Sequence, residues 1–348
     1  MHTLMILAAA AAAAEVTCDT IGEFDECVDL VGGVAYTSWS EEGDHDHDEQ
    51  LFIVCGAACE VTVTTLGDSY LVEDGLDGET GELSRRDAGL ALLRVHGSYE
   101  DDYVDVSGIT NAAGEAIIEL NGGDDTLFAS NPTVIRGGDG DDTIRATTAV
   151  EVHGGRGDDE IRIDAGDGTA AIYGGAGDDT LTGSRSGDFL MSGGDGNDFL
   201  YVRGRMTHAS DVAGQVRGDD GKDVIYGSRG DDDLWGGPGM DRIVGGAGND
   251  TIRGGGSSDT IIGGAGDDLV YAGPGDDTVR GRDGDDRLHG GKGDDLLVGS
   301  RGADILDGSG GENTVRGGPD EDACYITGDD PASGCELVES IPSGVAAN

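Results

Sequence analysis

The chain has 348 residues, of which 66 are glycine, and its 21 Lys and Arg against 71 Asp and Glu give a formal net charge of −50. This charge excludes electrostatic binding to nucleic acid, which requires a basic face, and it opposes docking on an anionic membrane surface. Aromatic residues make up only 5% of the chain, too few for an ordinary aromatic core. The composition therefore fits either a disordered acidic chain or a fold that gains stability from another source, such as bound metal.

The first segment, residues 1–14, is apolar and too short to span a bilayer. Ala12 and Ala14 form a small-x-small cleavage site, so we expect a secretory signal peptide over 1–14, although no basic residue precedes the apolar run. The alternative is a buried first element. No later segment reaches membrane-spanning length, and we expect a secreted, extracellular or cell-surface protein.

The next region, residues 15–119, alternates apolar and polar residues over 51–72 and 89–108, which predicts several strands. We expect a small disulfide-bearing β cap here, or degenerate early coils of a solenoid. Pairing of neighbouring cysteines in an oxidising compartment is one of 15 connectivities, and Cys55 with Cys59 could instead bind metal. The six cysteines lie near the two ends of the chain: Cys18, Cys27, Cys55, Cys59, Cys324 and Cys335.

The most informative feature is a repeat of nine residues. Residues 218–325 divide without a gap into twelve blocks such as GGAGNDTIR (245–253), and the eighth position is apolar in every block. Neither chance nor disorder accounts for this regularity. The sixth position is aspartate in all blocks except one, where it is Asn313: Asp223, Asp232, Asp241, Asp250, Asp259, Asp268, Asp277, Asp286, Asp295, Asp304 and Asp322.

Upstream, the same repeat continues with interruptions. We divide the chain accordingly into irregular repeats over 120–217, regular repeats over 218–325 and a C-terminal cap or tail over 326–348. A segment at 202–217 separates the two sets of repeats. The upstream copies lie at 137–145, 154–162, 174–182, a weaker 183–191, and 193–201.

Each position of the repeat has a physical reason. The glycine-rich half can adopt positive φ and turn sharply, so its carbonyl groups can point into the turn. Aspartate at position six adds an anionic oxygen, and oxygen ligands at variable geometry suit Ca²⁺ better than Mg²⁺. Positions seven to nine make a short strand with one inward apolar side chain. Stacked turns could then share ions between carboxylates and carbonyls.

These blocks resemble the RTX, or hemolysin-type, calcium-binding nonapeptide repeat. The resemblance implies an all-β, right-handed parallel β-roll or β-helix solenoid with two nonapeptides in each coil, and multiple Ca²⁺ ions as cofactors. Asn313, and Asp320 where glycine is usual, indicate that the last sites are weak or empty, and Ser257 makes its turn less certain. The calcium ligands that the resemblance implies are Asp142, Asp159, Asp179, Asp188, Asp198, Asp223, Asp232, Asp241, Asp250, Asp259, Asp268, Asp277, Asp286, Asp295 and Asp304.

One apolar side chain per nine residues gives a thin core, so we expect the chain to fold on binding calcium. The sequence carries neither HExxH nor GxSxG. We therefore expect no enzymatic activity, and a structural or interaction role outside the cell with calcium ions as partners. Two alternatives are an RTX-type extracellular hydrolase or toxin whose N-terminal region is active, and a calcium-dependent adhesin that binds a polysaccharide or a cell-surface partner.

Arginine recurs at position nine of the blocks. We expect these side chains to form a solvent-exposed row that tempers the acidic charge, with a binding stripe as the alternative. They are Arg145, Arg162, Arg253, Arg280 and Arg316.

Overall fold

The computed structural model consists of β-strands that follow the nonapeptide repeat. The chain divides into two compact units, residues 1–166 and 167–348, which are described separately. The residues that the structure describes are 26–30, 33–39, 49–55, 60–66, 69–74, 80–84, 90–109, 112–130, 134–147, 151–164, 170–183, 189–203, 214–327 and 331–341. The expected signal peptide over 1–14 lies outside them.

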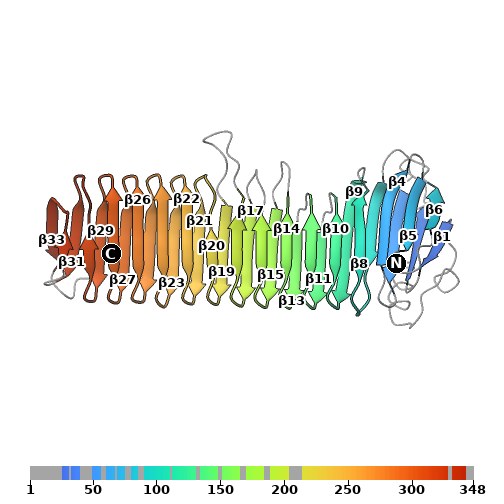
Figure 1. Ribbon diagram of the computed structural model, residues 1–348, viewed down its shortest axis with the longest axis horizontal. Coiled ribbons are helices and arrows are strands. Elements are labelled where there is room, and N and C mark those ends of the chain that lie inside the picture. Colours follow the sequence, from blue (N-terminus) through green and yellow to red (C-terminus); the bar gives the residue numbers. More distant parts are fainter. Residues whose placement is uncertain are drawn as a thin grey trace. The chain divides into compact units, whose positions relative to one another are not determined.

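The second unit is a parallel solenoid in which successive strands alternate between two sheets (Figure 1). One sheet contains β15 (Ala170–Ala176), β17 (Phe189–Asp195), β19 (Gly214–Asp220), β21 (Asp233–Pro238), β23 (Thr251–Gly256), β25 (Leu269–Pro274), β27 (Arg287–Lys292), β29 (Ile305–Gly310), β31 (Ala323–Thr327) and β33 (Leu337–Ile341). The other contains β16 (Thr180–Gly183), β18 (Phe199–Val202), β20 (Val224–Tyr226), β22 (Arg242–Ala247), β24 (Thr260–Ala265), β26 (Thr278–Asp283), β28 (Leu296–Arg301), β30 (Thr314–Arg316) and β32 (Ala332–Ser333).

Each strand pairs in parallel with the strand two places along the chain. Ile243 of β22 aligns with Ile261 of β24, and Leu234 of β21 aligns with Ile252 of β23, in each case 18 residues ahead. Two nonapeptides therefore make one coil, as the resemblance implied.

The first unit has the same two-sheet arrangement, with antiparallel strands at its N-terminal end. One sheet contains β1 (Glu26–Leu30), β2 (Gly33–Trp39), β3 (Glu49–Cys55), β7 (Leu90–His96), β9 (Ala112–Gly122), β11 (Val134–Asp139) and β13 (Glu151–Arg156). The other contains β4 (Glu60–Leu66), β5 (Ser69–Asp74), β6 (Thr80–Ser84), β8 (Tyr103–Gly108), β10 (Thr126–Ala129), β12 (Thr143–Ala146) and β14 (Glu160–Ile163).

The change from antiparallel to parallel pairing marks the start of the coils. β1, β2 and β3 pair in antiparallel fashion, as do β4, β5 and β6, whereas β3 pairs with β7 and β4 with β8 in parallel. Residues 15–119 thus contain both an antiparallel β segment and the first parallel coils.

The core is formed by the apolar residue at position eight of each block. In β24, for example, Ile261 is fully buried while Thr260 and Ile262 on either side are half-buried, because side chains alternate between the faces of a strand. The equivalent buried residues of the regular array are Ile225, Leu234, Ile243, Ile252, Ile261, Val270, Val279, Leu288, Leu297, Leu306, Val315 and Cys324.

The disulfide that the structure describes closes the C-terminal end, between Cys324 and Cys335. This pairing of neighbouring cysteines is confirmed. A disulfide-bearing cap was expected at the N-terminus, whereas the described disulfide lies at the C-terminal end. The side chains of the other four cysteines lie outside the described residues: Cys18, Cys27, Cys55 and Cys59.

The segment 202–217 does not interrupt the second unit. β18 and β20 keep their parallel register, with Leu200 opposite Ile225, although 25 residues separate them instead of 18. The parallel pairing therefore continues from β18 to β20.

Candidate metal centre

The position-six aspartates form three stacked rows, which we call ladders. The unit-1 ladder consists of Asp102, Asp125, Asp142 and Asp159. In the second unit, ladder A consists of Asp179, Asp198, Asp223, Asp241, Asp259, Asp277, Asp295 and Asn313. Ladder B consists of Asp232, Asp250, Asp268, Asp286, Asp304 and Asp322.

Within a ladder, one carboxylate oxygen is held by the backbone of the preceding coil. The backbone N–H of Asp250 donates to Oδ1 of Asp268 at 2.9 Å, and the N–H of Asp268 donates in turn to Oδ1 of Asp286 at 2.9 Å. This bond repeats along the ladders, and it fixes each carboxylate in orientation.

The other oxygen, Oδ2, is buried and accepts no hydrogen bond from any residue that the structure describes. A buried carboxylate oxygen without a partner is costly, and a row of them in a regular fold requires a compensating group. This holds for Asp125, Asp142, Asp198, Asp223, Asp241, Asp250, Asp259, Asp268, Asp277, Asp286, Asp295, Asp304 and Asp322.

Glycine at position one leaves a space beside Oδ2. A β-carbon built on Gly254 would lie 2.5 Å from Oδ2 of Asp259 and 2.6 Å from the carbonyl oxygen of Ala272 in the next coil. Two oxygens from successive coils thus border a cradle that is open because glycine has no side chain. Ala272 is the one residue at position one of the regular array that carries a β-carbon.

Two aspartates at the start of a row differ from the rest. The N–H of Ser228 donates to Oδ2 of Asp232 at 2.6 Å, and the N–H of Ser98 donates to Oδ2 of Asp102 at 2.6 Å. Both serines occupy position two, where most blocks have glycine at positive φ. The serine hydroxyl also accepts the N–H two residues on, at 3.0 Å from Gly230 and from Glu100.

Burial raises the pKa of these carboxyls towards neutrality. Desolvation raises the pKa of Asp250 and of Asp125 to about 8, with neighbouring aspartates adding to the increase and the ladder hydrogen bond opposing it. The pKa of Asp241 rises to about 6 for the same leading reason. Without a cation, the ladders therefore favour protonated carboxyls.

A second, exposed set of hydrogen bonds runs through position five. Here the direction is reversed: the N–H of Asp285 donates to Oδ1 of Asp267 in the preceding coil at 2.9 Å, and the N–H of Asp294 donates to Oδ1 of Asp276 at 2.9 Å. Each turn is thus tied to the coil before it and to the coil after it. This role of position five was not predicted from the sequence, although Asp or Asn recurs there in many blocks.

The structure brings the expected ligands together in ladders, with two qualifications. Asp188 lies outside the described residues, and Oδ2 of Asp232 accepts a hydrogen bond from the N–H of Ser228. Sequence reasoning missed Asp102 and Asp125, which precede the first full block but continue the unit-1 ladder. Ser257, at positive φ, does not interrupt its turn, since Asp259 keeps both ladder bonds at 2.8 Å.

Position nine forms exposed rows on the sheets. Arg253 pairs with Asp233 at 2.6 Å and, like Arg217, stacks on the ring of Trp235. Tyr271 stacks on His289 with the ring centroids 4.8 Å apart and the planes 6° apart. These side chains therefore stack on one another along the sheet. The ion pair of Arg253 agrees with the expectation that arginines at position nine temper the acidic charge.

The donor set fits calcium. Ca²⁺ takes six to eight oxygen ligands from carboxylates and carbonyls in flexible geometry. Both kinds of oxygen border the cradles of Gly236, Gly245, Gly254 and Gly299. In the part of the chain that the structure describes, no helix is long and apolar enough to cross a membrane.

Comparison with known families agrees with this geometry. The model of the RTX calcium-binding nonapeptide repeat matches residues 134–148, 164–200, 213–239, 235–270, 262–297, 271–306 and 289–324. Comparison with curated proteins gave no match. The matched residues span the ladders of the second unit and part of the unit-1 ladder, and the chain belongs to the RTX calcium-binding nonapeptide-repeat family.

Proposed function

We propose that this protein is a secreted β-roll that folds on binding several Ca²⁺ ions and has a structural or interaction role outside the cell. The observation that carries the proposal is the row of buried Oδ2 atoms without hydrogen-bond partners, most of them beside a glycine cradle. Calcium would neutralise these carboxylates and join successive turns, with the ladder aspartates and the position-one carbonyls as its ligands.

The energetics support a requirement for the ion. Each nonapeptide buries one apolar side chain, which contributes roughly 1.5–3 kcal/mol. Ordering nine residues costs on the order of 1–2 kcal/mol for each residue in backbone entropy alone. Burying a row of like charges adds a further cost. The free energy of calcium binding then becomes part of the free energy of folding.

The location follows from the same argument. Extracellular calcium modules bind at about 10⁻⁴–10⁻³ M. A site of that affinity is empty at the low calcium of a cytosol and occupied outside the cell, so export would couple to folding. The apolar segment at 1–14 and the disulfide Cys324–Cys335 are in keeping with an oxidising, extracellular compartment.

We further propose that the protein has no enzymatic activity of its own. The position-six aspartates are engaged in ladders, and the sequence carries neither HExxH nor GxSxG. A panel of esterase, glycosidase and protease substrates with the calcium-loaded full chain tests this, and turnover that survives purification would overturn it.

The main test is a calcium titration of the full chain followed by circular dichroism and calorimetry. We expect little β structure in EDTA and a cooperative gain on adding Ca²⁺. The variant with Asp250, Asp259 and Asp268 changed to Asn should shift the midpoint to higher calcium, whereas changing exposed Asp267, Asp276 and Asp285 to Asn should shift it much less. The same β-rich spectrum in EDTA and in Ca²⁺ would refute the proposal.

A further inference from the structure

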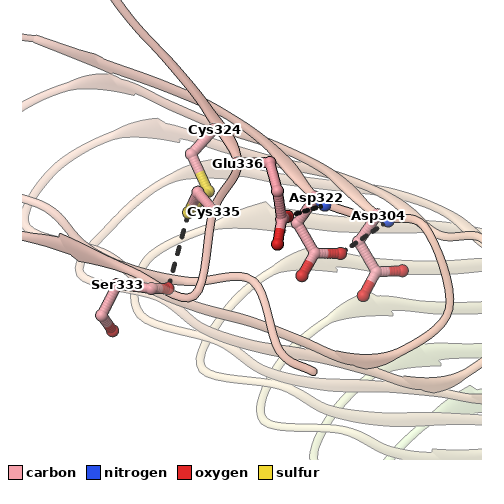
Figure 2. The surroundings of a disulfide bond; sticks show 6 residues. All are labelled: Asp304, Asp322, Cys324, Ser333, Cys335 and Glu336. Carbon is pink, nitrogen blue, oxygen red and sulfur yellow. Dashed lines mark hydrogen bonds between the residues drawn. A yellow bond between two sulfur atoms is a disulfide. The ribbon is translucent and has the colours of Figure 1, made fainter. Parts of the chain in front are cut away.

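The last coil is closed by a loop that the repeat does not predict. The disulfide Cys324–Cys335 joins residues 11 positions apart, and Figure 2 shows it beside Asp322 and Glu336. Cys324 occupies position eight of the last block and is 1% exposed, where other blocks place an aliphatic residue. The loop is therefore anchored in the core, and its C-terminal end is held against ladder B.

Glu336 continues ladder B beyond the last nonapeptide. The N–H of Asp304 donates to Oδ1 of Asp322 at 2.9 Å, and the N–H of Asp322 donates to Oε2 of Glu336 at 2.7 Å (Figure 2). Glu336 thus accepts the bond that a ladder aspartate accepts elsewhere, although it lies outside any nonapeptide.

The backbone explains why a glutamate serves here. The N–H of Glu336 donates to the carbonyl of Asp322 at 3.0 Å. In the preceding coil this bond comes from Ala323, the residue after the ladder aspartate, to the carbonyl of Asp304 at 2.8 Å. The main chain of Glu336 therefore stands one residue beyond the ladder position, and its longer side chain reaches back to it.

The cradle is also reproduced. A β-carbon built on Gly317 would lie 2.6 Å from Oδ2 of Asp322 and would meet the carbonyl oxygen of Gly334. In the preceding coil, the cradle of Gly299 is bordered in the same way by Asp304 and by the carbonyl of Gly317. Asp322 is 2% exposed, and its Oδ2 accepts no hydrogen bond from the described residues.

We propose that Asp322, the carbonyl of Gly334 and the carboxylate of Glu336 form a terminal Ca²⁺ site that the disulfide loop builds. The inference rests on the proposed function and extends it past the family repeat, whose match ends at residue 324. For ladder B, the inference contradicts the expectation from the sequence that the last calcium sites are weak or empty. Ladder A ends at Asn313, whose amide oxygen accepts the N–H of Asp295 at 2.9 Å and carries no charge.

The experiment counts calcium ions bound to the full, oxidised chain by native mass spectrometry at saturating Ca²⁺. We expect Glu336→Gln to bind one ion fewer than the natural chain. Cys335→Ala should also lose one ion, because it releases Gly334 and Glu336 while leaving Cys324 in the core. Glu321→Gln, which removes an exposed carboxylate one residue before Asp322, is the matched control and should keep the full count.

Circular dichroism in Ca²⁺ verifies that each variant is folded, and hydrogen exchange provides a second measurement. The amide of Asp322 should exchange faster in Cys335→Ala, which releases its acceptor Glu336, and its exchange rate should be unchanged in Glu321→Gln. An unaltered ion count in both Glu336→Gln and Cys335→Ala would overturn the inference and leave the proposed function standing. A natural chain that binds no calcium would refute the proposed function itself.

Discussion

Ser228 donates its backbone N–H to Oδ2 of Asp232 at 2.6 Å, so this aspartate has a hydrogen-bond donor where the next residue of ladder B, Asp250, has none. The two aspartates belong to consecutive coils, and each donates its backbone N–H to Oδ1 of the next ladder residue, Asp250 and Asp268 respectively. The backbone conformation at position two makes the difference. Ser300, at positive φ, donates its N–H to the carbonyl of Gly317 and leaves Oδ2 of Asp304 without a donor, whereas Ser228, which does not have positive φ, turns its N–H towards the carboxylate of Asp232.

This difference predicts unequal effects of two identical substitutions. A site with calcium at a hundred times its Kd contributes about 2.7 kcal/mol to the free energy of unfolding. Asp250→Asn should therefore lower the stability of the calcium-loaded chain by about 2.7 kcal/mol, whereas Asp232→Asn should cost under about 1 kcal/mol. Urea unfolding at fixed calcium measures both, and equal losses would show that the N–H of Ser228 does not take the place of calcium at Asp232.

The core can be tested with two adjacent isoleucines of β24. Ile261 is fully buried at position eight, and Ile262 at position nine is half-buried on the outer face. In calcium, Ile261→Ala should lower the free energy of unfolding by about 2–5 kcal/mol, because it leaves a cavity. Ile262→Ala should cost less than about 1 kcal/mol. Similar losses for the two variants would show that the two faces of the strand are not distinct.

The pKa shifts predict the pH dependence of the calcium-free chain. The folded-state pKa values of about 8 for Asp250 and about 7 for Asp259 lie above the usual value of 3.8. Groups with a raised folded pKa stabilise the fold fully below their unfolded pKa, and this contribution is lost as the pH rises through the folded values. In EDTA, the β signal should therefore be larger at pH 5.5 than at pH 8.

Calcium binding should show the complementary effect. Because Ca²⁺ and protons compete for the same carboxylates, the calcium affinity should rise between pH 5.5 and 8, and binding should release protons. Calorimetry in buffers of different ionisation enthalpy measures this release. A calcium-free chain that gains β structure as the pH rises, or calcium binding without proton release, would exclude buried ladder carboxyls.

The two-sheet coil could be predicted from the sequence because it depends on local periodicity. Aspartate at position six and an apolar residue at position eight recur every nine residues, and both roles follow from the turn and strand geometry. The early coils were harder to predict from the sequence, since the block around Asp102 lacks most of the glycines of the repeat. Ser228 shows a different limit: its effect on Asp232 depends on the direction of one N–H, which composition does not reveal.

Glu336 could not be predicted from the repeat for another reason. It lies outside any nonapeptide, and it directly follows Cys335, which the disulfide joins to Cys324 in the last block. The pairing of these cysteines was one of several connectivities compatible with the sequence. The contact is long-range and depends on how the loop returns to the last coil.

Ala272 offers a test of the glycine cradle with effects of opposite sign. It occupies position one of the turn of Asp277, and at the equivalent Gly254 a β-carbon would lie 2.5 Å from Oδ2 of Asp259. In EDTA, Ala272→Gly should destabilise any residual fold by about 0.5–1 kcal/mol, because glycine loses more backbone entropy. In calcium, it should raise the stability, since the cradle opens to the ion. Ala265→Gly, at exposed position three of another turn, should be destabilising in both conditions. Thermal unfolding of the natural chain and the two variants, with and without Ca²⁺, makes the comparison. If Ala272→Gly loses as much stability in calcium as Ala265→Gly, the residue at position one does not limit calcium binding.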